Sequence, residues 1–506
     1  MPAHVPMPRP RTAGILLHPT SLPGPYGVGD LGPAARAWVD LLARAGQTWW
    51  QVLPLNPPGA GDSPYSAFSA FAGNPLLVSP DDLAADGLLR TDELEAAHLP
   101  AGPVNYPLAA AAKNRLLTRA WARFRDGAAP ELLAEYTKFA ASAEWLEDYA
   151  LFTAIKETVP AGVWTDWPAG LVARDPAALD RARTDLADAV ARERFAQFCF
   201  ARQLAALRGY AAARGVKLLG DMPIFISGDS ADVWAAPHLF DLDADRRPRF
   251  VAGVPPDYFA VTGQRWGNPQ YNWDAMRADG FAWWAARVRA TLAQVDAVRL
   301  DHFRGFEAYW EIPARCPTAI EGRWVKGPGA ELLAALRDAL GELPLVAEDL
   351  GLITPEVDEL RERFGFPGMR ILQFAFGGAV EARFLPHAFD RNVVAYTGTH
   401  DNDTTRGWYA GLTPHEVAAL ERYAPEAKAD PVWALIRLAL ASVADTAIVP
   451  LQDVLDLGTE ARMNVPGTVG PWNWSWRATA EQLAPAAFDR LGALTATYGR
   501  ASAAPR

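Results

Sequence analysis

The stretch AVRLDHF, at residues 297–303, contains the pattern from which the fold can be worked out. Its apolar residues are those of a buried strand, and Arg299 and Asp301 lie toward its carboxyl end. Seven further short apolar runs lie along the chain, at residues 14–18, 48–53, 216–225, 343–350, 370–374, 393–399 and 447–454. Helical patterns lie between them, at residues 31–45, 192–214 and 331–340 among others. Strands alternating with helices predict parallel βαβ units, and eight such units predict an α/β fold of the (β/α)8 TIM barrel type.

The chain is about twice as long as a bare barrel needs. It has 506 residues, whereas eight strands and eight helices take ~250. We therefore predict a single catalytic barrel over residues 1–506, with one insertion subdomain at residues 54–215, between strands 2 and 3. A second insertion, at residues 226–296 between strands 3 and 4, carries a predicted lid loop at residues 251–273. About 50 residues follow the eighth strand, which is too short for a C-terminal β-sandwich domain of ~100 residues.

The composition excludes several classes of protein. Lys and Arg number 48 against 59 Asp and Glu, a net charge of −11, so a nucleic-acid partner is not expected. The two cysteines, Cys199 and Cys316, rule out a disulfide framework, and Cys199 is expected in the core. No apolar run reaches the ~20 residues of a membrane span. The amino terminus lacks the apolar core of a signal peptide, so we expect a cytoplasmic location. The 19 Trp either fill the core or stack on a ligand with weakly polar faces, such as a sugar.

Acidic residues end several of the predicted strands. They are Asp221, Asp301, Glu348, Asp349, Asp401, Asp403 and Asp453. Parallel strands of a barrel end on one rim, so these side chains should converge. Three interpretations are open: glycosyl chemistry by two carboxyl groups, a metal site, or structural pairing of acids with arginines. The run from His400 to Asp403 contains metal-ligand types but lacks a metal-binding spacing such as H-E-x-x-H.

The sequence neighbours of two acids indicate different roles. Arg299 lies two residues before Asp301, hence on the same face of a strand. A guanidinium there lowers the carboxyl pKa and keeps the group ionised, as a nucleophile requires. Glu348 follows an apolar run at residues 345–347, which would raise its pKa and retain a transferable proton. Asp349 alternates to the other face and is expected to be structural.

Several long motifs, and their order along the chain, resemble those of glycoside hydrolase family 77. These are the 4-alpha-glucanotransferases or amylomaltases of the alpha-amylase-like barrels. The motifs are SLPGPYGVGDLG (21–32), WWQVLPLNPPGAGDSPYSAFSAFAGNP (49–75), GDMPIFISGDSADVW (220–234), VAGVPPDYFAVTGQRWGNPQYNW (251–273), VRLDHFRGFEAYW (298–310), VAEDLGLITPEV (346–357), YTGTHDNDTTRGWY (396–409) and MNVPGTVGPWNW (463–474). They span nearly the whole chain.

The resemblance implies a role for each matching residue. Asp301 corresponds to the nucleophile, Glu348 to the general acid/base and Asp401 to the stabiliser of the transition state. The implied substrate contacts are Ser63, Tyr65, Asp221, Trp266, Arg299, His400 and Asn464. Of these, Tyr65 corresponds to a ring platform beneath the sugar and Trp266 to the tip of a mobile loop over the glucan. His302 is expected to face away from Asp301 and to be structural.

The implied reaction transfers a segment of an α-1,4-glucan to the 4-hydroxyl of another glucan or of glucose, with retention of configuration. Implied partners are maltooligosaccharides, amylose, glycogen and starch, with glucose as an acceptor, and neither a cofactor nor a metal is implied. Two alternatives share many of the same residues. One is an amylase-type hydrolase, and the other is a non-catalytic glucan-binding protein on a retained barrel.

Overall fold

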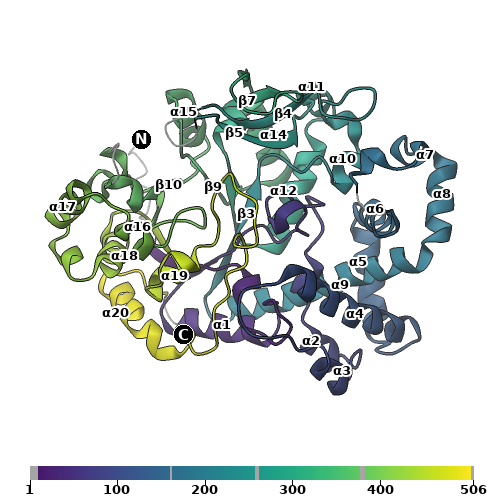
Figure 1. Ribbon diagram of the computed structural model, residues 1–506, viewed down its shortest axis with the longest axis horizontal. Coiled ribbons are helices and arrows are strands. Elements are labelled where there is room, and N and C mark those ends of the chain that lie inside the picture. The colour runs from purple at the N-terminus through teal and green to yellow at the C-terminus, as the bar shows by residue number, and fades with distance from the viewer. Residues whose placement is uncertain (1–9, 160–161, 257–260, 377–381, 503–506) are drawn as a thin grey trace, which may run out of the picture.

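A computed structural model describes residues 10–159, 162–256, 261–376 and 382–502 (Figure 1). Its larger sheet has eight strands in the order β10-β11-β12-β1-β2-β3-β6-β9, and all of its neighbouring strands pair in parallel. The strands are β1 (Thr12–Leu16), β2 (Trp49–Gln51), β3 (Lys217–Pro223), β6 (Ala297–Asp301), β9 (Leu345–Ala347), β10 (Gly368–Ile371), β11 (Val393–Tyr396) and β12 (Thr446–Pro450). Each overlaps one of the eight predicted runs, and the predicted TIM barrel is confirmed.

The two ends of this strand order meet. The amide of Ala347 in β9 donates to the carbonyl of Pro367, directly before β10, at 2.8 Å. The sheet therefore curls round into a barrel, with its strand ends gathered on one rim.

Helices cover the outside of the barrel. They include α1 (Pro33–Arg44), α9 (Ala187–Ala212), α12 (Ala282–Gln294), α14 (Gly329–Leu340), α15 (Pro355–Arg363), α16 (Thr405–Ala410), α17 (Pro414–Tyr423), α18 (Pro431–Ala441), α19 (Leu451–Val454) and α20 (Asp489–Thr497). The first begins at Pro33, whose fixed φ suits the first helical turn. Its Trp38 is fully buried, edge-on to Trp50 of β2 at 6.4 Å. An apolar helix face packed on a strand side chain is what holds such a layer in place.

The interval between β2 and β3 forms a helical insertion at the right of Figure 1. Before α9 it contains α2 (Pro80–Ala85), α3 (Thr91–Glu95), α4 (Tyr106–Arg125), α5 (Leu132–Ser142), α6 (Leu146–Thr158), α7 (Ala169–Val172) and α8 (Pro176–Asp185). Lys113 of α4 ties it to the barrel through a buried ion pair with Asp30, at 2.6 Å, and a hydrogen bond to the carbonyl of Val78. Lys113 is fully buried and paired, so removing either partner would leave a buried charge without compensation.

A second sheet lies above the barrel in Figure 1, and the sequence did not predict it. Its antiparallel strands run in the order β5-β4-β7-β8. They are β4 (Phe250–Val254), β5 (Gln264–Pro269), β7 (Ala308–Pro313) and β8 (Arg323–Lys326), with the short helices α10 (Ala231–Ala235), α11 (Trp273–Ala278) and α13 (Arg304–Glu307) nearby in the chain. Two intervals of the chain contribute to it, one before β6 and one after. Two parts of the predicted lid, residues 251–254 and 264–269, are therefore hydrogen-bonded strand rather than free loop.

The two ends of the described chain meet at a buried arginine. The side chain of Arg500 is fully buried and donates hydrogen bonds to the carbonyl oxygens of Leu440, Ser442 and Ala444, at 2.6 to 3.0 Å. It also donates to the carbonyl of Thr12, at the start of β1, at 3.0 Å. One side chain thus joins the first strand to the loop between α18 and β12.

Most of the tryptophans serve the core. Trp38, Trp50, Trp164, Trp234 and Trp284 are fully buried, whereas Trp266, Trp324 and Trp472 are exposed. Cys199 is buried in the core, as predicted. Within the described ranges, no helix is long and apolar enough to cross a membrane.

Candidate active site

The charged side chains of the candidate site come from the ends of neighbouring strands. Asp221 lies in β3, Arg299 and Asp301 in β6, and Glu348 directly after β9. The parallel register places Asp221 opposite Arg299, and Pro223 opposite Asp301. The Glu348 amide donates to the carbonyl of Leu300 at 3.0 Å, which extends the pairing by one residue. The sheet itself therefore brings these groups together.

Arg299 is the centre of this cluster. Its guanidinium contacts an oxygen of Asp221 at 2.7 Å and one of Asp301 at 2.9 Å. The side chains of Arg299 and Asp221 are almost completely buried, at 5% and 0% exposed, whereas Asp301 is 30% exposed. Arg299 and Asp301 thus share one strand face, as the period of two predicts. Of the three groups, Asp301 is the most exposed to an incoming molecule.

The pKa of Asp301 is raised to about 6. Burial is the largest cause, and the neighbouring charges of Asp221 and Asp401 act in the same direction. Arg299 lowers the pKa, as expected from the sequence, but burial outweighs it. The expectation that Arg299 would set a low pKa is therefore wrong in its net direction. The carboxyl group is still mostly ionised near neutral pH.

Glu348 has the higher pKa of the pair, raised to about 8 by burial first and then by the charge of Asp301. The direction agrees with the sequence prediction. Its two oxygens accept from the backbone amides of His302, at 2.8 Å, and Leu350, at 2.9 Å. These bonds fix the carboxyl group on both sides. Two carboxyl groups whose pKa values are pushed apart are what a nucleophile and a general acid require.

His302 and Asp349, the residues that follow these two acids, both serve the structure. His302 adopts a left-handed backbone with φ of 55°, which is uncommon outside glycine, and its amide bonds Glu348. Asp349 points away from the rim and accepts from the Met369 amide at 2.6 Å and from Arg370 at 3.1 Å. Asp349 thus has the structural role that alternation predicts.

Tyr65 links the acid cluster to the far side of the rim. Its hydroxyl is 2.8 Å from an oxygen of Asp221, 2.9 Å from His400 Nε2 and 3.2 Å from Arg299. The Tyr65 and His400 rings stack with centroids 5.2 Å apart and planes inclined by 15°. Ser63 is less direct, since its hydroxyl accepts from the Tyr65 amide at 3.3 Å and so shapes the turn before the ring.

Asp401 lies in the turn after β11, close to His400 and Asn464. Asn464 Nδ2 donates to an oxygen of Asp401 at 2.6 Å, and the Asn464 amide donates to the carbonyl of His400. Asp401 also lies 3.4 Å from His400 Nε2 and is 47% exposed. This arrangement holds one face of the carboxylate and leaves the other free.

Trp266 stands at a different point from the one predicted. It lies within β5, 40% exposed, rather than at the tip of a loop. Its indole is edge-on to the His302 ring, with centroids 4.9 Å apart, and its Nε1 donates to Gln264. Tyr258 and Phe259 of the predicted lid lie outside the described residues. Trp266 nevertheless adjoins the segment that follows Asp301.

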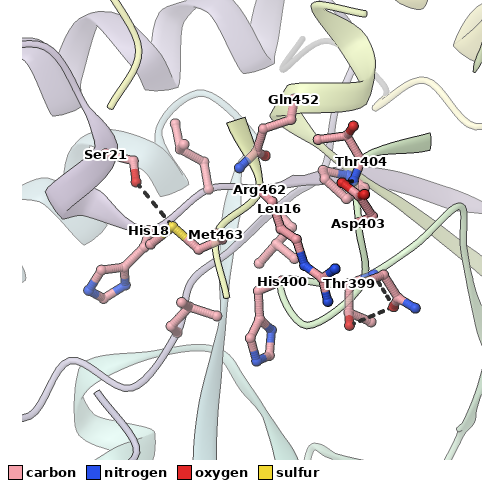
Figure 2. Close-up of a pocket in the computed structure, with 14 residues that line it drawn as sticks. Leu16, His18, Ser21, Thr399, His400, Asp403, Thr404, Gln452, Arg462 and Met463 are labelled. Carbon is pink, nitrogen blue, oxygen red and sulfur yellow. Dashed lines mark hydrogen bonds between the residues drawn. The ribbon is translucent and has the colours of Figure 1, made fainter. Parts of the chain in front are cut away.

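A pocket beside His400 adds residues that sequence reasoning missed (Figure 2). Its lining includes His18, Gln452, Arg462 and Met463, and Figure 2 shows the His18 and His400 rings pointing to the same side. Burial, reinforced by His400, lowers the pKa of His18 to about 3, so this imidazole is neutral. His18 ends the first predicted strand, and the strand-end rule would have found it had it been applied beyond the acids.

Asp453, also predicted at the rim, is structural. It lies in α19, fully buried, and accepts from the hydroxyls of Thr397 and Thr405 at 2.6 and 2.7 Å. In the described ranges no group of three or more His, Cys, Asp or Glu side chains could hold a metal ion.

A (β/α)8 barrel whose carboxylates converge at the carboxyl ends of the strands has the architecture of a barrel enzyme, and two carboxyl groups whose pKa values are pushed apart are what an enzyme acting on glycosidic bonds requires. The 4-alpha-glucanotransferase model of glycoside hydrolase family 77 matches residues 17–482, and the chain belongs to this family.

Relatives of known name agree with this assignment. The chain is 52% identical to the 4-alpha-glucanotransferase of Thermus thermophilus over 497 residues, which is 96% of this chain and 98% of that one. It is 44% identical to the chloroplastic/amyloplastic 4-alpha-glucanotransferase of Solanum tuberosum, over 97% of this chain and 86% of that one. Amylomaltase from Streptococcus agalactiae, solved in complex with acarbose, superimposes with a TM-score of 0.93 at 37% identity, covering 97% of this chain and 100% of that one.

Proposed function

We propose that this chain transfers segments of α-1,4-glucans by double displacement, with Asp301 as nucleophile and Glu348 as general acid and base. The observation that carries the proposal is the pair of carboxyl groups on neighbouring strand ends, one with a pKa near 6 and one near 8. Between these values Asp301 is ionised while Glu348 keeps its proton.

In the first step Asp301 attacks the anomeric carbon while Glu348 protonates the departing glycosidic oxygen. A covalent glycosyl-aspartate remains, and the segment that carries the protonated oxygen leaves. In the second step a 4-hydroxyl of another glucan, or of glucose, gives its proton to Glu348 and attacks the same carbon, which breaks the ester bond and releases the Asp301 carboxylate. Two inversions retain the configuration. Arg299 and Tyr65 hold the nucleophile's surroundings rigid, so that little reorganisation is needed when charge moves.

Asp401 is proposed to steady the positive charge that develops on the sugar ring. Its carboxylate is held by Asn464 and remains nearly half exposed, as a group that contacts substrate must be. Tyr65 and His400 form a stacked aromatic floor beside it. Asp221, Arg299, Ser63 and Trp266 complete the proposed substrate contacts.

Transfer requires the acceptor sugar to compete with water. Water, at about 55 M, is roughly 10⁴- to 10⁵-fold more concentrated than a millimolar sugar, and about 6 kcal/mol of acceptor binding offsets that difference. Contacts remote from the reacting hydroxyl can supply it by positioning the acceptor. The exposure of Trp266 beside His302, next to the proposed nucleophile, supports such a contact. We propose that residues 251–273 screen the intermediate from water.

Maltotriose as sole substrate tests the proposal. A transferase yields a ladder of longer glucans without a net gain of reducing ends, whereas a hydrolase gains one reducing end for each bond cut. Tight maltodextrin binding without turnover would support a non-catalytic protein instead. The same assay with maltooligosaccharides, amylose and glycogen defines the substrates, and added glucose tests the proposed acceptor. The cytoplasmic location stays a prediction.

A further inference from the structure

Trp324 is an exposed tryptophan outside the proposed site that has an unusual setting. It lies in β8 and is 39% exposed. The guanidinium of Arg304 lies 3.7 Å from the centroid of its ring, and Trp310, its partner across the β7–β8 pair, is edge-on at 5.2 Å. The Trp310 indole is itself fixed by a hydrogen bond to the carbonyl of Ala319. An exposed indole held this firmly presents a flat apolar surface at little entropic cost.

Arg304, which packs on Trp324, lies three residues after the proposed nucleophile in the chain. Asp301 is followed by His302, which packs against Trp266, and then by Phe303 and Arg304, which packs against Trp324. Two residues of chain span at most about 7 Å. The two exposed indoles are therefore held by side chains whose backbones lie within that distance of each other.

Both supports also bond to Glu348 or to the loop that follows it. The His302 amide donates to one Glu348 oxygen, and the Leu350 amide donates to the other. Arg304, itself buried, donates to the carbonyl of Leu352 in the same loop. Because Glu348 protonates the oxygen of the leaving chain, a glucan extending from that oxygen runs on this side of the site. Tyr65, His400 and Asn464 lie on the other side, around Asp401.

We propose that Trp324 is a second aromatic platform on the acceptor side, which stacks on a glucose unit of a long α-glucan beyond Trp266. The inference rests on the proposed function, since it assigns the platform to the leaving and incoming chains of that reaction. The weakly polar face of a glucose ring suits an indole ring that already packs against the guanidinium of Arg304. The platform makes the enzyme favour long acceptors over glucose.

The test compares radiolabelled glucose and radiolabelled maltohexaose as acceptors, with unlabelled amylose as donor, and measures elongation of the label. Trp324→Ala should raise the KM for maltohexaose about fivefold, the worth of one aromatic contact. The KM for glucose and the kcat should stay within about twofold. Trp324→Tyr, which keeps a ring over Arg304, should behave like the unsubstituted chain. Trp324→Leu, which keeps an apolar cover without a flat face, should behave like Trp324→Ala.

The matched control is Trp472→Ala, which removes another exposed indole, 56% exposed, from the segment after Asn464. It should leave the ratio of the two acceptor KM values unchanged. An equal effect of Trp324→Ala on both acceptors, or no effect, overturns the platform. So does a length preference that persists in Trp324→Leu, because it would show that no flat ring is needed. If the unsubstituted chain elongates neither acceptor, the proposed function itself fails.

Discussion

The barrel rim and the antiparallel sheet above it differ in the side chains that they carry. At the rim, Arg299, Asp221 and Tyr65 form a buried, hydrogen-bonded cluster around Asp301. The sheet instead exposes Trp266 and Trp324 to solvent, on strands β5 and β8, which are not part of the barrel. Bond chemistry requires fixed charges in a place from which water is largely excluded, whereas handling a long chain requires open apolar surfaces. Changes at the rim should therefore alter the chemical step, and changes in the sheet should alter the choice of acceptor.

Asp301→Asn should have the largest effect. It removes the proposed nucleophile while keeping the size of the side chain, and we expect transfer from maltotriose to fall about 10⁴-fold. Mass spectrometry should find no covalent glycosyl-enzyme. Asp274→Asn, on α11 with a 95% exposed side chain, is the matched control and should retain full activity. Near-normal turnover of Asp301→Asn would remove this residue from the mechanism.

Glu348→Gln should lower the rate about 10³-fold, in the range typical of a lost general acid. A donor whose leaving group needs no proton, such as α-maltosyl fluoride, should recover the first step in this variant and not in Asp301→Asn. Initial rates of fluoride release measure this difference. Equal rescue of both variants would show that the two carboxyl groups do not have separate roles.

Tyr65→Phe should lower kcat/KM about 10- to 100-fold, because hydrogen bonds to charged groups are worth ~1.5–3 kcal/mol. The hydroxyl lost contacts Asp221, Arg299 and His400, while the ring stacked on His400 remains. Steady-state kinetics with maltotriose measure the change. A loss confined to stability, with normal kinetics, would place Tyr65 outside the reaction.

The pH profile of kcat/KM should be bell-shaped. Asp301 must be ionised, so activity rises with pH up to its pKa of about 6. Glu348 must be protonated, so activity falls above its pKa of about 8. Outside these limits the change should approach tenfold per pH unit. Trp266→Ala, in the sheet, should keep both limbs, and an acid limb near pH 4 would contradict the burial of Asp301.

Trp266→Ala should have the smallest effect on bond cleavage and a selective effect on its outcome. We expect hydrolysis to rise about three- to tenfold relative to transfer, because one aromatic contact to the acceptor is lost. Reducing ends gained, divided by longer glucans formed from maltotriose, gives the ratio. An unchanged ratio would mean that the sheet does not favour sugar over water.

The barrel could be predicted because its strands have a local signature. Each is a short apolar run flanked by a helix, and parallel strands must end together, so Asp221, Asp301 and Glu348 were found from the sequence alone. Arg299 was placed correctly by alternation. The net shift in the pKa of Asp301 was not predicted correctly. Burial decides that shift, and the burial of Asp301 depends on segments that come from distant parts of the chain.

The antiparallel sheet lacks such a signature. Residues 251–273 contain prolines and glycines that indicate a loop, yet Gly253 pairs with Arg265 on one side and with Trp310 on the other. The Trp310–Trp324 pair depends on a register that only the folded chain reveals. Asp453 was misplaced for a similar reason, since strand β12 ends at Pro450 and the last residues of the predicted strand, 451–454, form α19.

Arg500 makes the order of synthesis matter for this protein. Its guanidinium bonds the carbonyl of Thr12, 488 residues earlier in the chain. At roughly 5–20 residues per second, the ribosome delivers this last contact about 25–100 s after the first strand. The carbonyl of Thr12 waits that long for this donor, whereas the carbonyls of residues 440, 442 and 444 wait only about 3–12 s. A chain truncated before Arg500 would lack these hydrogen bonds between its first strand and the residues before β12, even though all of its proposed active-site residues are present.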